Sequence, residues 1–353
     1  MKKHGLPGES GDSAWFERLN PFDQHETRHQ VEFKRRHWPE LPDGPWSKRP
    51  THSYPHILPK GHLCKAFYHP IACDLICYCH ENQVAIHSEA LNLRSSQVAC
   101  FNVMFPLRLN PELARKALKP LLPGVTDVNR IEFEYTGDEG ATKWLGEPPG
   151  GKRGQNRTSI DVAIWWQDSN RENLTLVEWK YTERSFGECG GFTSRGNRNK
   201  QSCDELDVSS PNAAEKCYLA QATNPRLSRH YWDHMNEAGI NLKSLKGIKG
   251  CPFRGPFYQL LRQYLLAAYL RKSDKVDRVD VALVAFSGNS SVLDLPPYLS
   301  ELGDSIVDAW NALLVGVPEL RYIEVEKIIE AMKSDSSGAS RPLLDYLKDR
   351  YGL

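Results

Sequence analysis

Two apolar stretches decide the fold of this chain: residues 158–166, TSIDVAIWW, and residues 174–183, LTLVEWKYTE. Both are rich in β-branched and aromatic residues, which predicts two β-strands. Residues 167–175, which include Asp, Asn and Ser, predict a hairpin turn between them. Because successive side chains of a strand alternate faces, Glu178 and Lys180 should point to the same side, and pairing of the strands can bring Asp161 beside them.

Two carboxylates and an ammonium on one face of a sheet are costly unless further charges accompany them. A divalent metal and a scissile phosphate would supply a cation and an anion. The other interpretation is a structural ion pair between Glu178 and Lys180. The element order around these residues favours the catalytic interpretation, because a helix at residues 256–272 and a strand at residues 276–286 follow them.

This pattern resembles the PD-(D/E)XK nuclease superfamily, in which an acid ends one strand and (D/E)-x-K lies on the next. Ile160 stands where the motif has proline. Residues 85–290 also resemble prokaryotic restriction-endonuclease-like proteins. The resemblance implies an α/β fold with a restriction-endonuclease-like core, in which helices flank a central mixed sheet. It also implies that Asp161 and Glu178, with the backbone carbonyl of Trp179, bind Mg²⁺ or Mn²⁺, and that Lys180 stabilises the developing charge or orients the attacking water.

A third acid often comes from an earlier element in that superfamily. The candidates are Glu89, Glu132 and Glu134, and Glu89 is preferred because it lies in an expected helical stretch at residues 86–107. Glu132 and Glu134 should share one face of a strand at residues 128–135. For each of the three, a simple surface charge is the alternative.

Gln259 and Tyr264, on the expected helix, resemble the Gln…Tyr pair of the RecB-like nuclease branch. Their spacing is five residues rather than the expected four. Gln259 is expected either to bond the E-x-K strand or to contact a DNA phosphate, and a surface amide is the alternative.

Four cysteines form the second signal. Cys189, Cys203 and Cys217 lie in a polar insert, residues 182–251, and Cys251 lies at its end. So long an insert is unusual in a compact domain, and a metal held by four thiolates would stabilise it. A [4Fe–4S] cluster is favoured over zinc because no C-x-x-C pair occurs, and unligated thiols are the third interpretation. A second group of cysteines and histidines lies earlier in the chain, and its cysteines are interpreted mainly as thiols of the core. Its members are His62, Cys64, His69, Cys73, Cys77, Cys79 and His80.

The chain has 353 residues and a net charge of +1, so any binding of DNA must rely on local basic residues. Candidates are Lys152, Arg153, Arg157, Arg195, Arg198, Lys200, Arg254 and Arg262. No apolar run is long enough for a membrane span and no signal core is visible, so we expect a cytoplasmic protein with cysteines as thiols or metal ligands.

Four regions are expected along the chain. Residues 1–60 form an extended arm or a loosely ordered cap, and residues 61–125 form the helical N-terminal part of the core. Residues 126–290 form the nuclease core with its insert, and residues 291–353 form a C-terminal helical region.

The expected function is metal-dependent hydrolysis of DNA by a restriction- or defence-like endonuclease. The first alternative is a RecB-like exonuclease or repair nuclease with an iron–sulfur cluster. The second is a nucleic-acid-binding protein that does not cut, and a redox or regulatory protein comes last. Cutting both strands usually requires two sites, which suggests a homodimer, and any helicase or methyltransferase activity would have to come from a partner.

Overall fold

The computed structural model describes residues 14–148, 156–169, 171–220, 228–273, 276–335 and 338–353. Its centre is one five-stranded sheet in the order β3-β4-β5-β6-β7. The strands are β3 (Asp127–Tyr135), β4 (Ile160–Gln167), β5 (Glu172–Lys180), β6 (Arg278–Ala285) and β7 (Arg321–Glu324). The pairs β3–β4 and β4–β5 are antiparallel, whereas β5–β6 and β6–β7 are parallel. The expected α/β fold with a mixed central sheet is confirmed.

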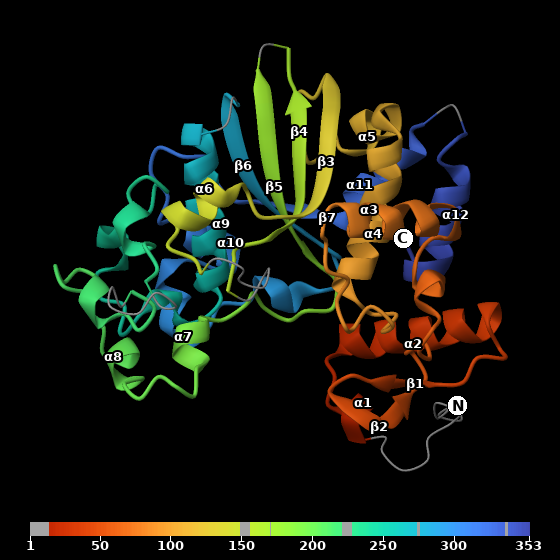
Figure 1. The fold of residues 1–353 in the computed structure, drawn as a ribbon, viewed down its shortest axis with the longest axis horizontal. Helices are drawn as coiled ribbons and strands as arrows, with labels where there is room; N and C mark the ends of the chain where they lie inside the picture. Colours follow the sequence, from red (N-terminus) through yellow and green to blue (C-terminus); the bar gives the residue numbers. More distant parts are fainter. Residues whose placement is uncertain (1–13, 149–155, 170, 221–227, 274–275, 336–337) are drawn as a thin grey trace.

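Helices cover both faces of this sheet (Figure 1). On one face lie α6 (Glu139–Trp144), α9 (Phe257–Ser273) and α10 (Ile306–Asn311), whose apolar residues form what we call the α9-side cluster. On the other face lie α3 (Ala72–Glu81), α4 (Ser96–Leu109), α5 (Pro111–Ala117), α11 (Val325–Lys333) and α12 (Arg341–Tyr351), which form the α4-side cluster.

The central strands contribute to both clusters. In β4, Val162 and Ile164 belong to the α4-side cluster, and Ala163 and Trp165 belong to the α9-side cluster. A strand that is covered on both faces needs apolar residues at every position. This explains the nearly continuous apolar sequence of β4 and β5.

The N-terminal region differs from expectation. Residues 21–37 form the helix α2 (Pro21–His37), so a loosely ordered segment is the wrong prediction there. Asn20 caps α2 by accepting a hydrogen bond from the Asp23 backbone N–H. The buried side chains of α2 are mostly polar, which hides the apolar period that predicts a helix. A short helix α1 (Ala14–Glu17) precedes α2, and a hairpin of β1 (Gly44–Trp46) and β2 (Arg49–Tyr54) follows it; residues 1–13 lie outside the described residues.

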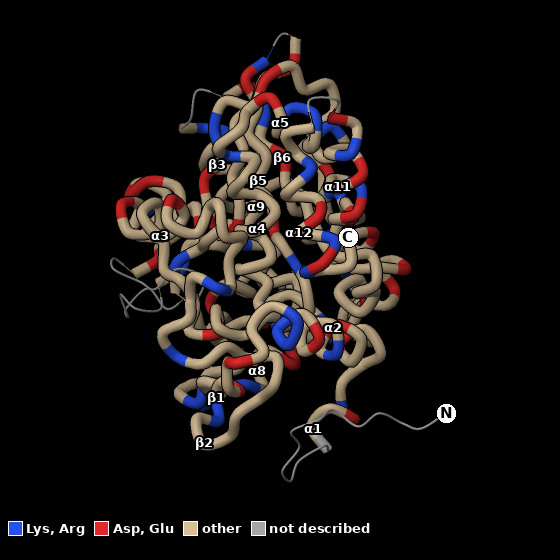
Figure 2. The backbone as a smooth tube through the Cα atoms, turned by 90° about the vertical axis from the view of Figure 1, so that its right-hand side faces the viewer, with Lys and Arg blue, Asp and Glu red and all other residues tan. Residues whose placement is uncertain are grey.

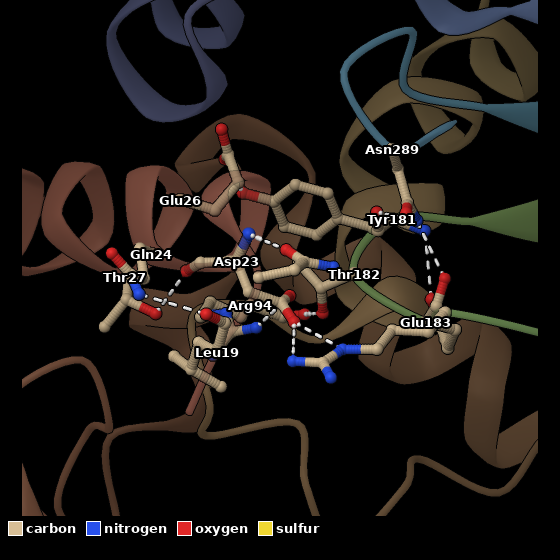
Figure 3. A network of polar contacts seen from close by, with 12 residues as sticks. Leu19, Asp23, Gln24, Glu26, Thr27, Arg94, Tyr181, Thr182, Glu183 and Asn289 are labelled. Carbon is tan, nitrogen blue, oxygen red and sulfur yellow. Dashed lines mark hydrogen bonds and ion pairs between the residues drawn. The ribbon is translucent and has the colours of Figure 1, made fainter. Parts of the chain in front are cut away.

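The buried polar side chains of α2 bind the chain that leaves β5 (Figure 3). Asp23 accepts hydrogen bonds from Arg94, at 2.5 Å, and from Arg184, at 2.9 and 3.0 Å. Next to it, the Tyr181 hydroxyl donates to the buried carboxylate of Glu26. α2 is therefore part of the core that fixes the end of β5.

Two further boundaries differ from the sequence prediction. The helix expected at residues 86–107 begins only at Ser96, where Ser95 accepts a hydrogen bond from the Val98 N–H. It also continues through Pro106 to Leu109. Pro106 removes only one backbone hydrogen bond near the end of a helix whose neighbouring side chains are buried, and the packing compensates for that loss.

The remaining elements agree closely with expectation, apart from β7. The strands expected at residues 128–135 and 276–286 correspond to β3 and β6, and the helix expected at residues 256–272 corresponds to α9. Helices α10, α11 and α12 lie in residues 291–353, which were expected to be helical. Asn110 caps α5. The four-residue strand β7 is too short to show an alternating pattern in sequence.

The insert between β5 and α9 contains only short helical turns, among them α7 (Gly190–Thr193) and α8 (Gln201–Asp204). It nevertheless packs on the core, because Phe186, Leu206, Val208 and Leu219 join the α9-side cluster. Lys and Arg alternate with Asp and Glu along the surface helices (Figure 2), in keeping with the net charge of +1. Among the described residues, no helix combines the length and the hydrophobicity that a membrane span requires.

We expect Asp23→Ala to destabilise the fold by about 3–5 kcal/mol, because it leaves Arg94, which is largely buried, without its carboxylate partner. The matched control is Asp345→Ala, which breaks an exposed ion pair with Arg341 and should cost less than about 1 kcal/mol. Urea denaturation of both variants measures the difference. Equal losses would show that the contact of α2 with the end of β5 contributes little.

Candidate active site

The residues expected from the E-x-K pattern meet in one cavity. Because β4 and β5 are antiparallel and Val162 pairs with Val177, the start of β4 lies beside the end of β5. A cavity of about 630 Å³ opens there. Its lining includes Asp161, Glu178, Trp179, Lys180, Glu89 and Gln259.

Asp161 lies where β4 loses its regular alternation. Ile160 packs in the α9-side cluster, but Val162, two residues further, packs in the α4-side cluster. In a regular strand these two side chains would share a face. The break lets the Asp161 carboxylate reach across to β5, where its Oδ2 accepts a hydrogen bond of 2.7 Å from the Trp179 N–H.

Burial raises the pKa of Asp161 well above its ordinary value, and the charges of Glu178 and Glu134 raise it further. Lys180 and the Trp179 N–H oppose this shift without cancelling it. The negative charge gathered around Asp161 therefore exceeds what the protein itself neutralises. A divalent cation would relieve this imbalance, so the residues present fit the metal that the resemblance implies.

Glu178 is the most constrained carboxylate of the cavity, with a relative exposure of 2%. Its Oε1 lies 2.7 Å from the Lys180 Nζ and accepts a hydrogen bond of 2.5 Å from the Gln259 amide. Its Oε2 accepts from the Gln263 amide. Buried carboxylates require such partners, and here one cation and two amides supply them.

Gln263 is a site residue that the sequence analysis missed. It follows Gln259 by four residues on α9, so the two side chains lie on the same face of the helix. Tyr264, the residue named by the RecB-like pattern, points elsewhere: its hydroxyl donates to the Pro318 carbonyl, and its ring packs 5.4 Å from that of Trp310. The sequence did contain a signal for Gln263: it stands four residues after Gln259, the spacing at which the RecB-like pattern has tyrosine.

Lys180 remains a cation in this setting. Burial alone would lower its pKa, but the charges of Glu178, Glu183 and Asp161 raise the pKa above its ordinary value. The Gln259 carbonyl oxygen lies 3.4 Å from the Lys180 Nζ and accepts a hydrogen bond from the Gly187 N–H at 2.7 Å. Gln259 thus bonds the E-x-K strand, as one of the two alternatives expected.

Glu134 is the acid of β3 that reaches the cavity. Its φ is 50°, a conformation rare for residues other than glycine. Phe133 packs in the α4-side cluster, whereas Tyr135 packs against the α9-side cluster, so the strand changes faces at Glu134. The amide of Gln97 and the hydroxyl of Ser159 each donate to the Glu134 carboxylate at 2.8 Å.

Glu89, the preferred third acid, also lines the cavity, but its surroundings differ from expectation. It lies in a turn rather than in a helix. Its carboxylate accepts a hydrogen bond from the exposed Ser47 hydroxyl. Its role stays a prediction, and Glu134 is the better placed of the two because it is buried beside Asp161. Glu132 instead pairs with Arg130, at 3.3 Å.

Both backbone polar groups of Trp179 form hydrogen bonds with side chains: the N–H with Asp161 and the carbonyl with Ser96. Its carbonyl, an expected metal ligand, accepts a hydrogen bond of 3.2 Å from the Ser96 hydroxyl, which in turn accepts from the Tyr181 N–H at 3.1 Å. This occupies one of the two lone pairs of the carbonyl oxygen. As the described side chains stand, no three of the His, Cys, Asp or Glu residues form a group that could hold a metal ion. A metal would therefore have to draw its ligands together, whether they are these carboxylates or the cysteines of the insert.

Cys189, Cys203, Cys217 and Cys251 line a single small cavity of about 20 Å³. Burial raises the pKa of Cys189 to about 11 and raises the pKa of Cys203 and Cys251 as well. The charge of Cys217 adds to the shift of each of these three thiols, and the charges of Cys189 and Cys203 also add to the shift of Cys251. The folded insert thus gathers four cysteines that are far apart in sequence.

The other candidate residues are more dispersed. Of the earlier cysteines, Cys79 is buried, but Cys64, Cys73 and Cys77 are exposed. Arg262, expected to contact DNA, is buried and lies 3.6 Å from Glu147. Arg195, Arg198 and Lys200 are exposed, whereas Lys152 and Arg153 lie outside the described residues.

Comparison with known protein families gives one match. Residues 23–352 match the family described as "Restriction Endonuclease associating with ARP". Searches of curated proteins and of solved structures gave no significant match. The expected resemblance to restriction-endonuclease-like nucleases is therefore confirmed, and the chain belongs to the family of restriction endonucleases associating with ARP.

Proposed function

We propose that this protein is a metal-dependent nuclease that hydrolyses DNA phosphodiester bonds by PD-(D/E)XK chemistry. The observation that carries the proposal is the meeting of Asp161, Glu178, Glu134 and Lys180 in one cavity. Membership of a restriction-endonuclease family supports it. A restriction- or defence-like endonuclease is the proposed form, and a RecB-like exonuclease is the alternative.

In this proposal Asp161 and Glu178 hold Mg²⁺ or Mn²⁺, with Glu134 as the third carboxylate. A metal held by these carboxylates would lower the pKa of a bound water and neutralise charge at the scissile phosphate. Lys180 acts as a cation and not as a general base, because the surrounding carboxylates keep it protonated. Its ammonium group stabilises the charge that develops on the phosphate oxygens, and Gln259 holds it in position.

The proposed partners follow from the same chemistry. DNA is the substrate, and a homodimer would bring the two sites that a double-strand cut requires. The family description adds association with ARP, which we extend to this chain as part of the proposal.

We also propose a metal at Cys189, Cys203, Cys217 and Cys251. The cavity that they surround, about 20 Å³, is close to the space of a single water and small for a four-iron cluster. A single ion such as Zn²⁺, bound tetrahedrally by four thiolates, suits this space better than the [4Fe–4S] cluster favoured on sequence grounds.

Lys180→Met keeps the length of the side chain and removes its charge. We expect plasmid cleavage with Mg²⁺ to slow by at least about 100-fold, the usual loss when one electrostatic stabiliser is removed. Lys119→Met, a change of an exposed lysine far from the cavity, is the control and should cleave at the normal rate. Normal cleavage by Lys180→Met would reduce the lysine to a structural partner of Glu178.

Asp161→Asn tests the metal site without an activity readout. Asparagine keeps an acceptor for the Trp179 N–H but removes the buried charge, so the metal-free variant should melt a few degrees higher at neutral pH. Because the folded pKa of Asp161 is raised, its destabilising effect appears as the pH rises above the unfolded value of about 4 and is absent below it. Mn²⁺ should raise the melting temperature of the wild type much more than that of the variant.

The contrary result for Asp161→Asn is a lower melting temperature in the absence of metal, together with an equal response to Mn²⁺. It would mean that the carboxylate is well compensated by the protein and binds no cation.

Metal analysis of purified protein tests the cysteine site. We expect about one zinc per chain in a colourless sample, and loss of both the zinc and thermal stability in Cys203→Ser. Cys73→Ser changes an exposed thiol outside the insert and should alter neither. A brown sample with four irons per chain would instead favour the cluster.

A further inference from the structure

A second cavity opens beside the catalytic one. Its volume is about 350 Å³, and it shares Trp46, Asn92 and Arg94 with the catalytic cavity. Its other walls come from α1 and β2 and from the residues that directly follow each of them, below α2 in Figure 1. Whatever occupies this second cavity therefore lies next to whatever occupies the first.

Aromatic rings form the walls of the second cavity. The ring of Trp15 lies 5.1 Å from that of Tyr54 and 5.5 Å from that of His56. Trp46 lies on the other side of Tyr54, at 6.0 Å. Tyr54 and His56 are buried, whereas Trp15 and Trp46 are partly exposed, so both indole rings have surface available for a flat ligand.

His56 is a buried polar residue in the lining of this cavity. Its side chain is 4% exposed, and its Nδ1 has no hydrogen-bond partner among the described residues. Burial, with the charges of Arg94 and Lys34, lowers the pKa of His56 well below its ordinary value, so the ring is neutral. An unpaired ring nitrogen in an apolar site costs free energy. The nitrogen is closed to solvent, so a ligand that bonds it would require a shift of the His56 ring.

The charge of the second cavity is positive, because Arg18 and Arg49 line it and none of its lining residues is Asp or Glu. Arg94 also lines it, but its charge is paired with Asp23. Arg18 and Arg49 are exposed. The wall of the catalytic cavity, by contrast, contains several carboxylates. Exposed arginines beside an aromatic pocket match the phosphates that flank a nucleobase.

We propose that the second cavity binds an unpaired nucleobase of the DNA strand whose phosphate lies in the catalytic cavity. This inference rests on the proposed nuclease function. The base would stack on Trp15, its polar edge would bond His56, and Arg18 and Arg49 would contact the neighbouring phosphates. The enzyme would accordingly prefer DNA that offers an unpaired or easily extruded base next to the cleavage point.

The test is DNA binding in EDTA, where cleavage does not contribute. Fluorescence anisotropy compares a duplex that carries a one-nucleotide bulge with the same duplex whose bulged nucleotide is abasic. We expect the wild type to bind the first about tenfold or more tightly, because stacking of one base is worth about 1–3 kcal/mol. Trp15→Ala should lose this preference, and Trp15→Phe should keep most of it.

Trp38→Ala is the matched control, because its ring lies outside both cavities and packs on Phe33. It should keep the preference. Arg49→Ala, in the exposed hairpin, should weaken binding of both duplexes by the same factor and reduce its salt dependence. An equal affinity of the wild type for the two duplexes, or an unchanged preference in Trp15→Ala, would overturn the base pocket.

The two proposals fail in different ways. If the protein prefers the bulged base but never cuts DNA in Mg²⁺, the nuclease proposal is wrong and the pocket stands. If it cuts DNA without any such preference, only the pocket is wrong. If it does not bind DNA at all, both are wrong.

Discussion

The buried carboxylate of Glu178 is the constraint on which the site depends. A charge that is 2% exposed must be paired and fully hydrogen-bonded, and its partners come from two elements. Lys180 lies on the same strand, whereas Gln259 and Gln263 come from α9. Both glutamines must face β5, so this pairing sets the rotation of α9 about its axis. The opposite side of the helix is then free to bury Tyr264 against Trp310.

A second constraint comes from the sheet. β4 is covered on both faces, so regular alternation would place each of its side chains in one of two apolar clusters. The edge strand β3 buries its side chains mainly in the α4-side cluster. The changes of face at Glu134 and Asp161 allow carboxylates to leave this pattern and enter the cavity. The positive φ of Glu134 is an unfavourable local conformation, and the amide of Gln97 and the hydroxyl of Ser159 help to hold it. Such strain is common where a protein positions reactive groups.

The sequence predicted β4 and β5 because runs of β-branched and aromatic residues extend over eight or nine positions. Alternation of side chains along a strand then placed Glu178 and Lys180 on one face. It could not predict α2, because the buried face of that helix carries Asp23, Glu26 and Gln30 instead of apolar residues. Glu134 was one of three candidate acids, but the sequence could not single it out. Alternation places it on the same face as Glu132, and only its positive φ separates them. Gln263 escaped notice because the expected residue at that spacing was tyrosine.

The cavity around Asp161 is thus organised at the expense of stability. Desolvation and two neighbouring carboxylates oppose the ionisation of Asp161, and the one lysine nearby is already bonded to Glu178. A fold selected only for stability would replace Asp161 with a neutral residue, because an uncompensated buried charge is among the most costly features of a protein interior. The presence of Asp161 and of the strained Glu134 is explained if a cation completes the charge balance. The hydrogen bonds of Asp23 on α2 hold the end of β5 in place while the site is without a cation.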